Sequence, residues 1–582
     1  MKKLLLALLL VAAMVITFAA CNDNPAGGTT EGNGTTDAPE ETEAPLVEVE
    51  LAKGETEDIV KEQYKGNTTL VNIAIPEGVK NIQDSAFENC TSLKKVIFPS
   101  TLKEINLNAF AGCTSLEEIV IKSEVKYVST VAFTNAPVTK VTIADGVDDI
   151  GKLFLRTFPK LTTVEIGEGA TTLEDISLLD CTNLTSVKLP STLTTIAANN
   201  FKNCRSLETI EIPATVKKIG ANAFANCTSL KEIVIPDGVT ELKDGVFKNC
   251  SSATKITFGK VNKIGADVFS GCSSLESVEI PSAIKELSAG TFRDCHGLKS
   301  ADVSSLTVIP DRLFFNCYAL SDVKLSKSIT SIGKEAFRNT AITAYEFPAT
   351  LVSIGDSAFQ GTKLTTANIQ GVKEIGDYVF KDCVQLKNVT LPANVTSIGM
   401  YAFYNTAIET IAIPDGVTYL PTNVFAKCTA LKSINLNKVT EIGYRAFEGC
   451  TALKTVDLGD VTKIGGYAFI RCYALESIDL TGVKTVKNDA FHGCISLKSV
   501  NLGKDLVAIE DSAFFNCVKL ETVTGSLENL TLLGCLNSHL LSIETVQLPS
   551  SVEEFPNYDE IVKELKDFSN NYESDYVPFE PQ

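Results

Sequence analysis

Apolar positions along this chain follow one pattern that returns every 21 to 23 residues. One copy begins with Leu230, Ile233 and Ile235, whose L-x-x-L-x-L spacing predicts a short strand with two inward side chains. Pro236 cannot donate a hydrogen bond to a neighbouring strand, so the strand should end there. Asp237 and Gly238 then predict a turn.

The second half of the copy predicts two further pieces. Val239 and Leu242 indicate another short extended segment, and Val246, Phe247 and Cys250 fall on one face of a single helical turn. The phenylalanine, here called the anchor, recurs through most of the chain: Phe87, Phe110, Phe133, Phe154, Phe201, Phe224, Phe247, Phe269, Phe292, Phe314, Phe337, Phe359, Phe380, Phe403, Phe425, Phe447, Phe469, Phe491 and Phe514, with Leu178 and Leu532 in its place twice.

A fixed period of this length predicts a solenoid, because one short unit cannot bury its own apolar face and must stack on its neighbours. We therefore expect a β-rich or α+β repeat rod of about 21 coils of 21–23 residues, with parallel strands on one face and turns opposite. The degenerate copies near Phe154 and Leu178 predict local irregularity and not a domain break.

The repeats resemble the BspA-like (Treponema-type) leucine-rich repeats, whose consensus is close to L-x-x-I-x-I-P-x-x-V-x-x-I-G-x-x-A-F-x-x-C. The resemblance covers residues 70–550 or so. It implies a bacterial surface protein, since members of that family are known chiefly as adhesins for host matrix proteins, host cells or other microbes.

The ends of the chain differ from its middle. Residues 1–20 read as a secretory signal, and Phe18-Ala-Ala-Cys21 resembles the lipobox of bacterial lipoproteins, which implies acylation of Cys21. The alternative is an uncleaved membrane anchor. Residues 21–45 predict a disordered acidic tether, 46–69 an N-terminal cap, 70–552 the solenoid, and 553–582 a C-terminal cap helix with an acidic tail.

Within these caps, Leu46–Leu51 should add a strand and Thr56–Tyr64 a short helix. A capping box at Asn557 and Glu560 starts the C-terminal helix, with a partner-binding helix as the alternative.

Charge is concentrated in the flanks. The chain carries a net charge of −19, of which residues 22–62 contribute −10 and residues 553–582 contribute −7, while residues 63–552 carry only −4. This distribution predicts no affinity for nucleic acid and no contact with a membrane other than through the lipid anchor.

The seventeen cysteines consist of Cys21 and sixteen that stand three residues after an anchor. Ala136, Thr157, Thr340, Thr362 and Thr406 occupy that position in other copies, and threonine cannot form a disulfide. The position three residues after each anchor, here called the cysteine column, therefore predicts buried free thiols. These thiols would act as small apolar groups and weak hydrogen-bond donors.

Nothing in the chain predicts catalysis, a cofactor or a metal site. His296, His492 and His539 lie far apart, and there is no CxxC pair, P-loop, H-E-x-x-H or EF-hand loop. We therefore expect a binding protein and not an enzyme.

Two sets of residues are candidate ligand contacts. The outward strand position forms a polar ladder at Asn435, Asp457, Asp479 and Asn501, which could bind a glycan, a basic peptide or Ca²⁺, or could be a solvated sheet face. Tyrosines cluster beside the anchors and are either partner contacts or packing between coils: Tyr378, Tyr401, Tyr404, Tyr444, Tyr467 and Tyr473.

The resulting hypothesis is a lipid-anchored cell-surface adhesin or ligand-binding protein, secreted to the bacterial envelope and engaging an extracellular protein or host matrix partner. A glycan-capturing surface module and an architectural envelope protein without a ligand are the alternatives.

Overall fold

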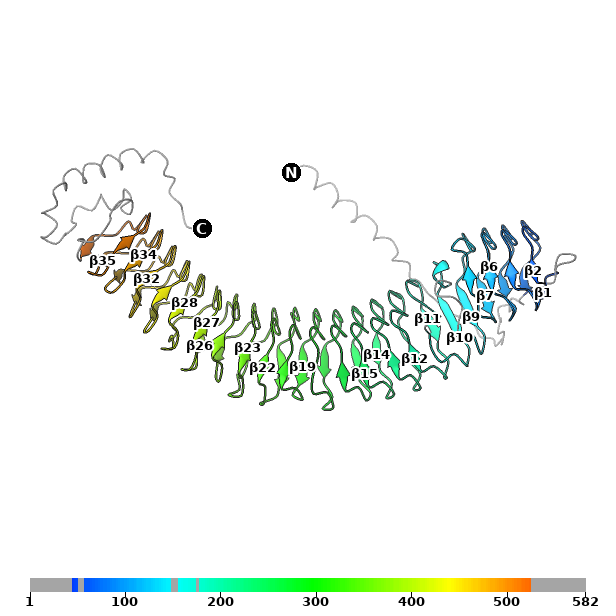
Figure 1. Ribbon diagram of the computed structural model, residues 1–582, viewed down its shortest axis with the longest axis horizontal. Coiled ribbons are helices and arrows are strands. Elements are labelled where there is room, and N and C mark those ends of the chain that lie inside the picture. The colour runs from blue at the N-terminus through cyan, green and yellow to red at the C-terminus, as the bar shows by residue number, and fades with distance from the viewer. Residues whose placement is uncertain (1–43, 51–56, 148–154, 174–176, 525–582) are drawn as a thin grey trace, which may run out of the picture. The chain divides into compact units, whose positions relative to one another are not determined.

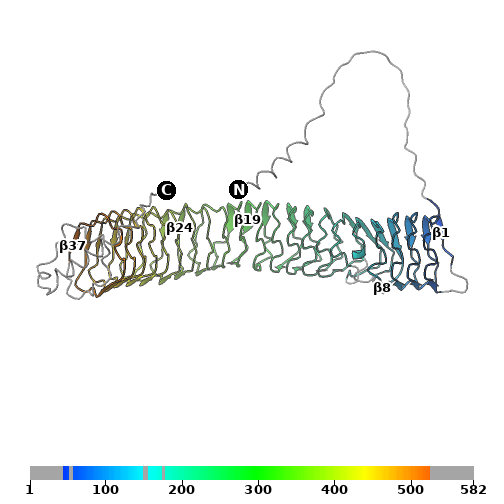
Figure 2. The same cartoon turned by 90° about the horizontal axis from the view of Figure 1, so that it is seen from above.

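The computed structural model describes residues 44–50, 57–147, 155–173 and 177–524, and the account below concerns those residues. They form a stack of similar coils in which each coil lies beside the next along the solenoid (Figures 1 and 2). The predicted signal peptide, Cys21, residues 22–43 of the predicted tether, the last repeat copy and the predicted C-terminal cap lie outside the described residues.

Most coils contribute one longer strand to the first of two parallel ladders, the long-strand ladder. Neighbouring strands pair in register, as in Ile73 with Val96 and Val96 with Ile119. Its strands are β1 Leu46–Glu48, β3 Asn72–Ala74, β5 Lys95–Ile97, β7 Glu118–Ile121, β9 Lys140–Ile143, β10 Thr163–Ile166, β11 Ser186–Lys188, β14 Glu232–Val234, β16 Lys255–Thr257, β18 Ser277–Glu279, β19 Ser300–Val303, β21 Asp322–Leu325, β24 Thr366–Asn368, β26 Asn388–Thr390, β29 Ser433–Asn435, β31 Thr455–Asp457, β33 Ser477–Asp479, β35 Ser499–Asn501 and β37 Thr522–Thr524.

The second extended piece of each coil forms the short-strand ladder, which the sequence pattern located correctly. Ile82, for example, pairs with Ile105 of the next coil. Its strands are β2 Asp58–Ile59, β4 Asn81–Ile82, β6 Glu104–Ile105, β8 Tyr127–Val128, β12 Thr195–Ile196, β13 Lys218–Ile219, β15 Glu241–Leu242, β17 Lys263–Ile264, β20 Val308–Ile309, β22 Ser331–Ile332, β23 Ser353–Ile354, β25 Glu374–Ile375, β27 Ser397–Ile398, β28 Tyr419–Leu420, β30 Glu441–Ile442, β32 Lys463–Ile464, β34 Thr485–Val486 and β36 Ala508–Ile509.

The predicted helical turn at the anchor is wrong. Among the described residues the single helical element is the 3₁₀ helix η1, Leu155–Thr157, and the anchor segments are stacked β-turns. Around Phe87, the amides of Ser85, Phe87 and Asn89 donate to carbonyls of the next coil, while those of Ala86 and Cys90 donate to carbonyls three residues back. A helix keeps its amides within one segment, so it cannot supply these bonds between coils.

This alternation requires a left-handed backbone two residues before and two residues after each anchor. Ser85 and Asn89 have φ of 58° and 62°, and the same two positions have positive φ in most coils. Asparagine, aspartate and glycine tolerate this conformation best, which explains why they are frequent there. We call the seven residues centred on each anchor, taken over all coils, the turn edge.

The anchor rings form a column inside the stack, which is interrupted between Phe133 and Phe201. Phe87 lies with its ring centroid 5.0 Å from that of Phe110, and the two planes differ by 3°. The same arrangement joins Phe447, Phe469 and Phe491 at 5.0 and 5.2 Å. These rings are fully buried, so each coil completes the hydrophobic core of its neighbour.

The N-terminal cap differs in part from the prediction. Leu46–Glu48 does add a strand, which pairs with β3. The helix expected over 56–64 is wrong within the described residues from 57 onward, because Asp58–Ile59 is a strand and turns follow it. Tyr64 occupies the anchor position there and stacks on Phe87 at 5.1 Å, so this segment is one more coil.

The degenerate region is irregular but continuous, as expected. Leu155–Thr157 is helical, and Phe158 packs its ring edge against Phe133 at 4.9 Å in place of a stacked anchor. Strands β9, β10 and β11 nevertheless pair through this region without a break in register.

The cysteine column supplies an additional hydrogen bond between most coils. The Sγ of Cys450 donates to the carbonyl of Phe425 at 3.1 Å, and Cys227 and Cys494 make the equivalent bonds to Phe201 and Phe469 at 3.2 and 3.3 Å. Where threonine replaces cysteine, Thr340 and Thr406 donate to the anchor carbonyl of their own coil. All fifteen described cysteines are free and buried, which confirms the predicted role of the column.

Replacing Phe447 with alanine should destabilise the coils around it by about 3–5 kcal/mol, since it removes a buried ring from the column. Because contacts in a solenoid join only neighbouring coils, hydrogen exchange should rise near Phe425 and Phe469 and stay unchanged near Phe110. Uniform loss of protection along the chain would contradict this view of the stack.

Burial should also make the thiols unreactive in the folded protein. It raises the pKa of Cys272 to about 12 and that of Cys428 to about 11, above the usual thiol value. At pH 9 a thiol reagent should therefore leave Cys272 and Cys428 unmodified in the folded protein and should reach them after denaturation. These thiols ionise at a lower pH in the unfolded chain than in the folded protein. Their burial should therefore contribute less to the stability of the fold as the pH rises from about 9 towards 12.

Candidate functional site

The candidate tyrosines lie on the turn edge in two groups. In the first, the rings of Tyr378 and Tyr401 stack at 5.0 Å with planes 15° apart, and Tyr404 lies 5.5 Å from Tyr401. The Nζ of Lys381 is 5.4–5.8 Å from the centroids of all three rings. Lys427 approaches Tyr404 from a following coil at 5.3 Å.

The second group is built in the same way around an arginine. Tyr444 and Tyr467 meet edge to face at 5.6 Å, and the guanidinium carbon of Arg445 lies 5.2 and 5.0 Å from their ring centroids. A hydrogen bond to Asp489 raises the pKa of the Tyr467 hydroxyl. Tyr473 is half-buried on the turn that follows Cys472 and belongs to neither group.

Three of these tyrosines occupy strained backbone positions. Tyr378, Tyr401 and Tyr467 stand two residues before their anchors with φ of 57–60°. A left-handed conformation costs a bulky residue on the order of 1–2 kcal/mol, and several other coils place asparagine or glycine there, although Arg312 and Glu335 adopt the same conformation. Ring stacking and cation–π contacts are each worth about 0.5–1.5 kcal/mol, so they offset the strain without a large surplus.

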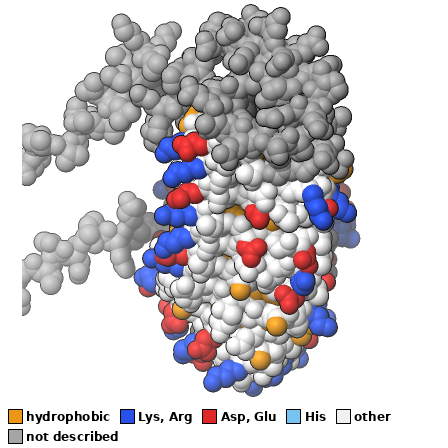
Figure 3. All heavy atoms as spheres, turned by 90° about the vertical axis from the view of Figure 1, so that its left-hand side faces the viewer, with side chains coloured by type: hydrophobic (Ala, Val, Ile, Leu, Met, Phe, Trp, Pro, Cys, Tyr) orange, Lys and Arg blue, Asp and Glu red, His pale blue; other side chains and the backbone are white. Residues whose placement is uncertain are grey.

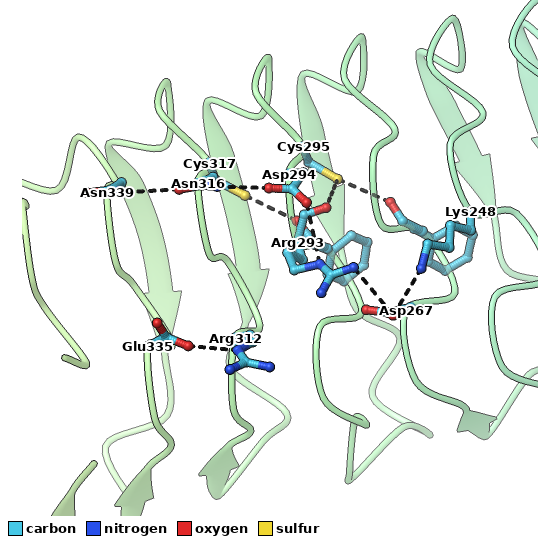
Figure 4. Close-up of polar contacts among 12 residues, drawn as sticks. Lys248, Asp267, Arg293, Asp294, Cys295, Arg312, Asn316, Cys317, Glu335 and Asn339 are labelled. Atoms are coloured by element: carbon cyan, nitrogen blue, oxygen red, sulfur yellow. Dashed lines mark hydrogen bonds and ion pairs between the residues drawn. The ribbon is translucent and has the colours of Figure 1, made fainter. Parts of the chain in front are cut away.

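Earlier coils of the turn edge hold polar networks, together with a cation–π contact of Arg338 with Phe315 at 5.5 Å. Asp294, Asn316 and Asn339 form a ladder in which each amide donates to the residue of the preceding coil at 2.9 Å (Figure 4). The Glu335 carboxylate bonds Arg312 and Arg338 at 2.7 and 2.6 Å. Partial burial raises the pKa of Glu335, but the two guanidinium groups outweigh it and hold the pKa below its usual value.

The polar ladder on the long-strand face aligns as the sequence predicted. Asn435 pairs in register with Asp457, and Asp479 with Asn501. The side-chain oxygens, however, close the following turns: the Oδ1 atoms of Asn435, Asp457, Asp479 and Asn501 accept the amides two residues on at 2.9, 3.2, 3.0 and 3.4 Å.

This turn contact explains where the ladder occurs. Outward residues followed two positions later by proline, such as Ala74 before Pro76 and Val234 before Pro236, are never aspartate or asparagine. Proline has no amide to donate, so those side chains would have no turn to close. A local structural requirement therefore accounts for the polar residues, and their binding role stays a prediction.

Some charges on the strand faces are paired between coils. Lys432 pairs with Glu409 in the preceding coil and Lys463 with Glu441 at 2.6 Å. Viewed from the C-terminal end of the stack, acidic and basic side chains alternate along one edge (Figure 3). These pairs are exposed, so each contributes little to stability, but opposite charges in adjacent coils favour one register.

The residues described above form no enclosed catalytic site. The Nδ1 of His492 lies 2.8 Å from the Asp489 carboxylate on the turn edge, and its ring contacts Phe515. One shallow recess of about 240 Å³ lies beside the first coils, lined by Asp58, Lys61, Asn81, Gln83, Asp84, Glu104 and Asn106. Within the described ranges, no group of three or more His, Cys, Asp or Glu residues could hold a metal, and no helix has the length and apolarity needed to cross a bilayer.

Two parallel strand ladders that run along the same stack, together with the column of stacked anchor rings, define a leucine-rich repeat solenoid. The family model for the BspA type leucine-rich repeat region matches residues 43–158, 151–262, 240–366, 352–476 and 462–558. These matches cover most of the chain, so the protein belongs to the BspA-type leucine-rich repeat family.

Several solved structures are similar to this chain. A leucine-rich repeat protein from Bacteroides ovatus is 24% identical with a TM-score of 0.33, and 78% of this chain and 86% of that chain are covered. A leucine rich cell surface protein from Faecalibacterium prausnitzii is 25% identical with a TM-score of 0.28, covering 67% and 84%. The T. pallidum leucine-rich repeat protein is 25% identical with a TM-score of 0.18, covering 35% and 78%. No curated protein matches the chain.

Replacing Asp479 with alanine should destabilise its own turn by about 1 kcal/mol, because it removes the acceptor for the amide and hydroxyl of Thr481. These bonds lower the pKa of Asp479, so the contribution should be present at neutral pH and lost as acid protonates the carboxylate. Amide exchange at Thr481 measures the effect, and Asp479→Asn is the control that keeps the acceptor. Equal exchange in all three proteins would contradict the turn-closing role.

Proposed function

We propose that this protein is a cell-surface binding protein that engages an extracellular protein through the turn edge of its C-terminal half. The observation that carries the proposal is the pair of tyrosine groups, three of whose members stand at positions where the backbone disfavours tyrosine. Tyrosine and arginine are the residues that most often dominate protein interfaces, because they combine large contact area with polar ends.

The shape of the fold favours binding over catalysis. A stack of coils exposes a long repetitive surface, whereas general acid–base chemistry needs a cleft that excludes water and shifts pKa values. Membership of a leucine-rich repeat family supports the same conclusion.

Attachment to the membrane belongs to the same proposal. Cys21 follows an apolar signal and precedes an acidic segment, so acylation of this cysteine would tether the solenoid to the outer face of a membrane. The solenoid itself then needs no membrane-binding surface.

The tyrosine groups are tested by replacing Tyr378, Tyr401, Tyr444 and Tyr467 together with serine in the full chain. Binding to an array of matrix proteins, mucins and polysaccharides should weaken at least tenfold for the partner captured by the unaltered protein. A matched control replaces Asn435, Asp457, Asp479 and Asn501 with serine on the long-strand face. Loss of binding in the control alone would move the site to the polar ladder.

The nature of the partner separates this function from its alternative. A glycan-capturing module is the second candidate, since exposed aromatic rings also stack on sugars. Capture of polysaccharide alone from the array would favour it over protein binding. An absence of any partner at high concentration would count against both and leave an architectural role.

The anchor is tested separately by changing Cys21 to serine. The unaltered protein should partition into detergent and incorporate labelled fatty acid, whereas C21S should do neither. Fatty-acid labelling that persists in C21S would contradict acylation at this residue.

A further inference from the structure

A group of cations accompanies the tyrosines on the turn edge, and we call the combined surface the cationic tyrosine patch. It covers the five coils anchored by Phe380, Phe403, Phe425, Phe447 and Phe469, whose rings stack at 5.0–5.7 Å. Its cations are Lys381, Lys427, Arg445 and Arg471.

The patch is cationic within an acidic protein. The turn edge of these five coils holds four cations and the three acids Asp377, Asp382 and Glu448, whereas the whole chain has a net charge of −19. The acids already have partners. Glu448 lies 3.1 Å from Arg445, Asp382 lies 4.0 Å from Lys381, and Asp377 accepts the amide of Met400 at 2.7 Å.

Two cations are left without an ion pair among the described residues, Lys427 and Arg471. Both stand two residues after an anchor, with φ of 60° and 61°, where other coils place asparagine, aspartate or glycine. The hydrogen bond from Lys427 to Tyr404 raises the pKa of Lys427, so this side chain stays charged at neutral pH. Among the described residues, the strain at Arg471 has no compensating side-chain contact of this kind.

The spacing of these two cations restricts what can bind them both. They occupy equivalent positions two coils apart, which corresponds to about 10 Å at a coil spacing of about 4.8 Å. In a segment with polyproline II conformation, residues i and i+3 lie on the same side of the chain and are separated by about 9 Å. Carboxylates at that spacing could reach both cations.

We infer that the cationic tyrosine patch recognises an acidic, extended segment of a protein partner, with carboxylates directed to Lys427 and Arg471. This inference rests on the proposed function and adds the chemistry of the partner. It also predicts that ionic strength weakens binding, because exposed charge pairs are screened by salt.

The test uses the full-chain protein and fluorescein-labelled poly-L-glutamate, followed by fluorescence anisotropy over a range of salt concentrations. The unaltered protein should bind, and the double variant K427E/R471E should bind at least tenfold more weakly with a smaller dependence on salt. A matched control, K217E/K218E, makes the same change in net charge on the short-strand face and should bind as the unaltered protein does.

Three results would overturn the inference. These are no binding of poly-L-glutamate by the unaltered protein, equal weakening in the control, and binding of heparin that matches poly-L-glutamate in strength and in sensitivity to K427E/R471E. Protection of the buried thiols in each variant verifies that the stack is folded.

Failure of this inference is distinguishable from failure of the proposed function. If the tyrosine variant loses the captured extracellular protein while K427E/R471E retains it, the turn edge binds a protein but does not select it by carboxylates. If neither variant affects capture, the partner binds elsewhere on the solenoid.

Discussion

The stacking of one anchor turn on the next is the constraint on which the rest of this structure depends. Three interactions coincide there: alternate amides donate to the following coil, the anchor rings stack, and a cysteine Sγ donates to the anchor carbonyl of the preceding coil. All three interactions require equivalent residues of neighbouring turns to lie directly beside one another. The two strand ladders, which consist of strands only two to four residues long, are then held in register by the turns between them.

This constraint decides what the turn edge can offer a partner. Its backbone must be left-handed at two positions per coil. This conformation restricts which residue types can occur there, whatever chemistry a partner would require. Asparagine ladders satisfy both demands in coils such as those of Asn316 and Asn339. The tyrosines of the C-terminal half, and the cations there that have no ion pair among the described residues, depart from that pattern, and the proposed binding role rests on this departure.

Much of the fold was predictable because the period of Phe247 and its equivalents can be read without knowledge of local geometry. The helical turn was wrong because apolar residues at i, i+1 and i+4 face inward in a stacked turn as well as in a helix. Tyr64 was missed as an anchor because its copy lacks phenylalanine and cysteine. Frequent asparagine and glycine at fixed distances from the anchor would have indicated left-handed turns.

The sequence predicted where the candidate residues lie in the coils, but it did not predict which groups surround them. The ladder from Asn435 to Asn501 was placed in one row correctly, yet its turn hydrogen bonds were visible only indirectly, through the absence of proline two residues later. The tyrosines were assigned to the correct edge, but the cations among them were not, because Lys381 and Arg445 meet rings from more than one coil. Contacts between coils depend on side-chain direction, which repeat spacing alone does not determine.

The burial of the thiol column has a consequence for the surroundings in which the protein can operate. A protein with this many cysteines would ordinarily be sensitive to oxidants, since exposed thiols cross-link or become sulfenic acids. Here every described thiol is enclosed by the coils on either side. The folded solenoid should therefore keep the same covalent structure in oxygen-free and in aerated surroundings. Oxidants should damage mainly those molecules whose coils have already separated and exposed their thiols.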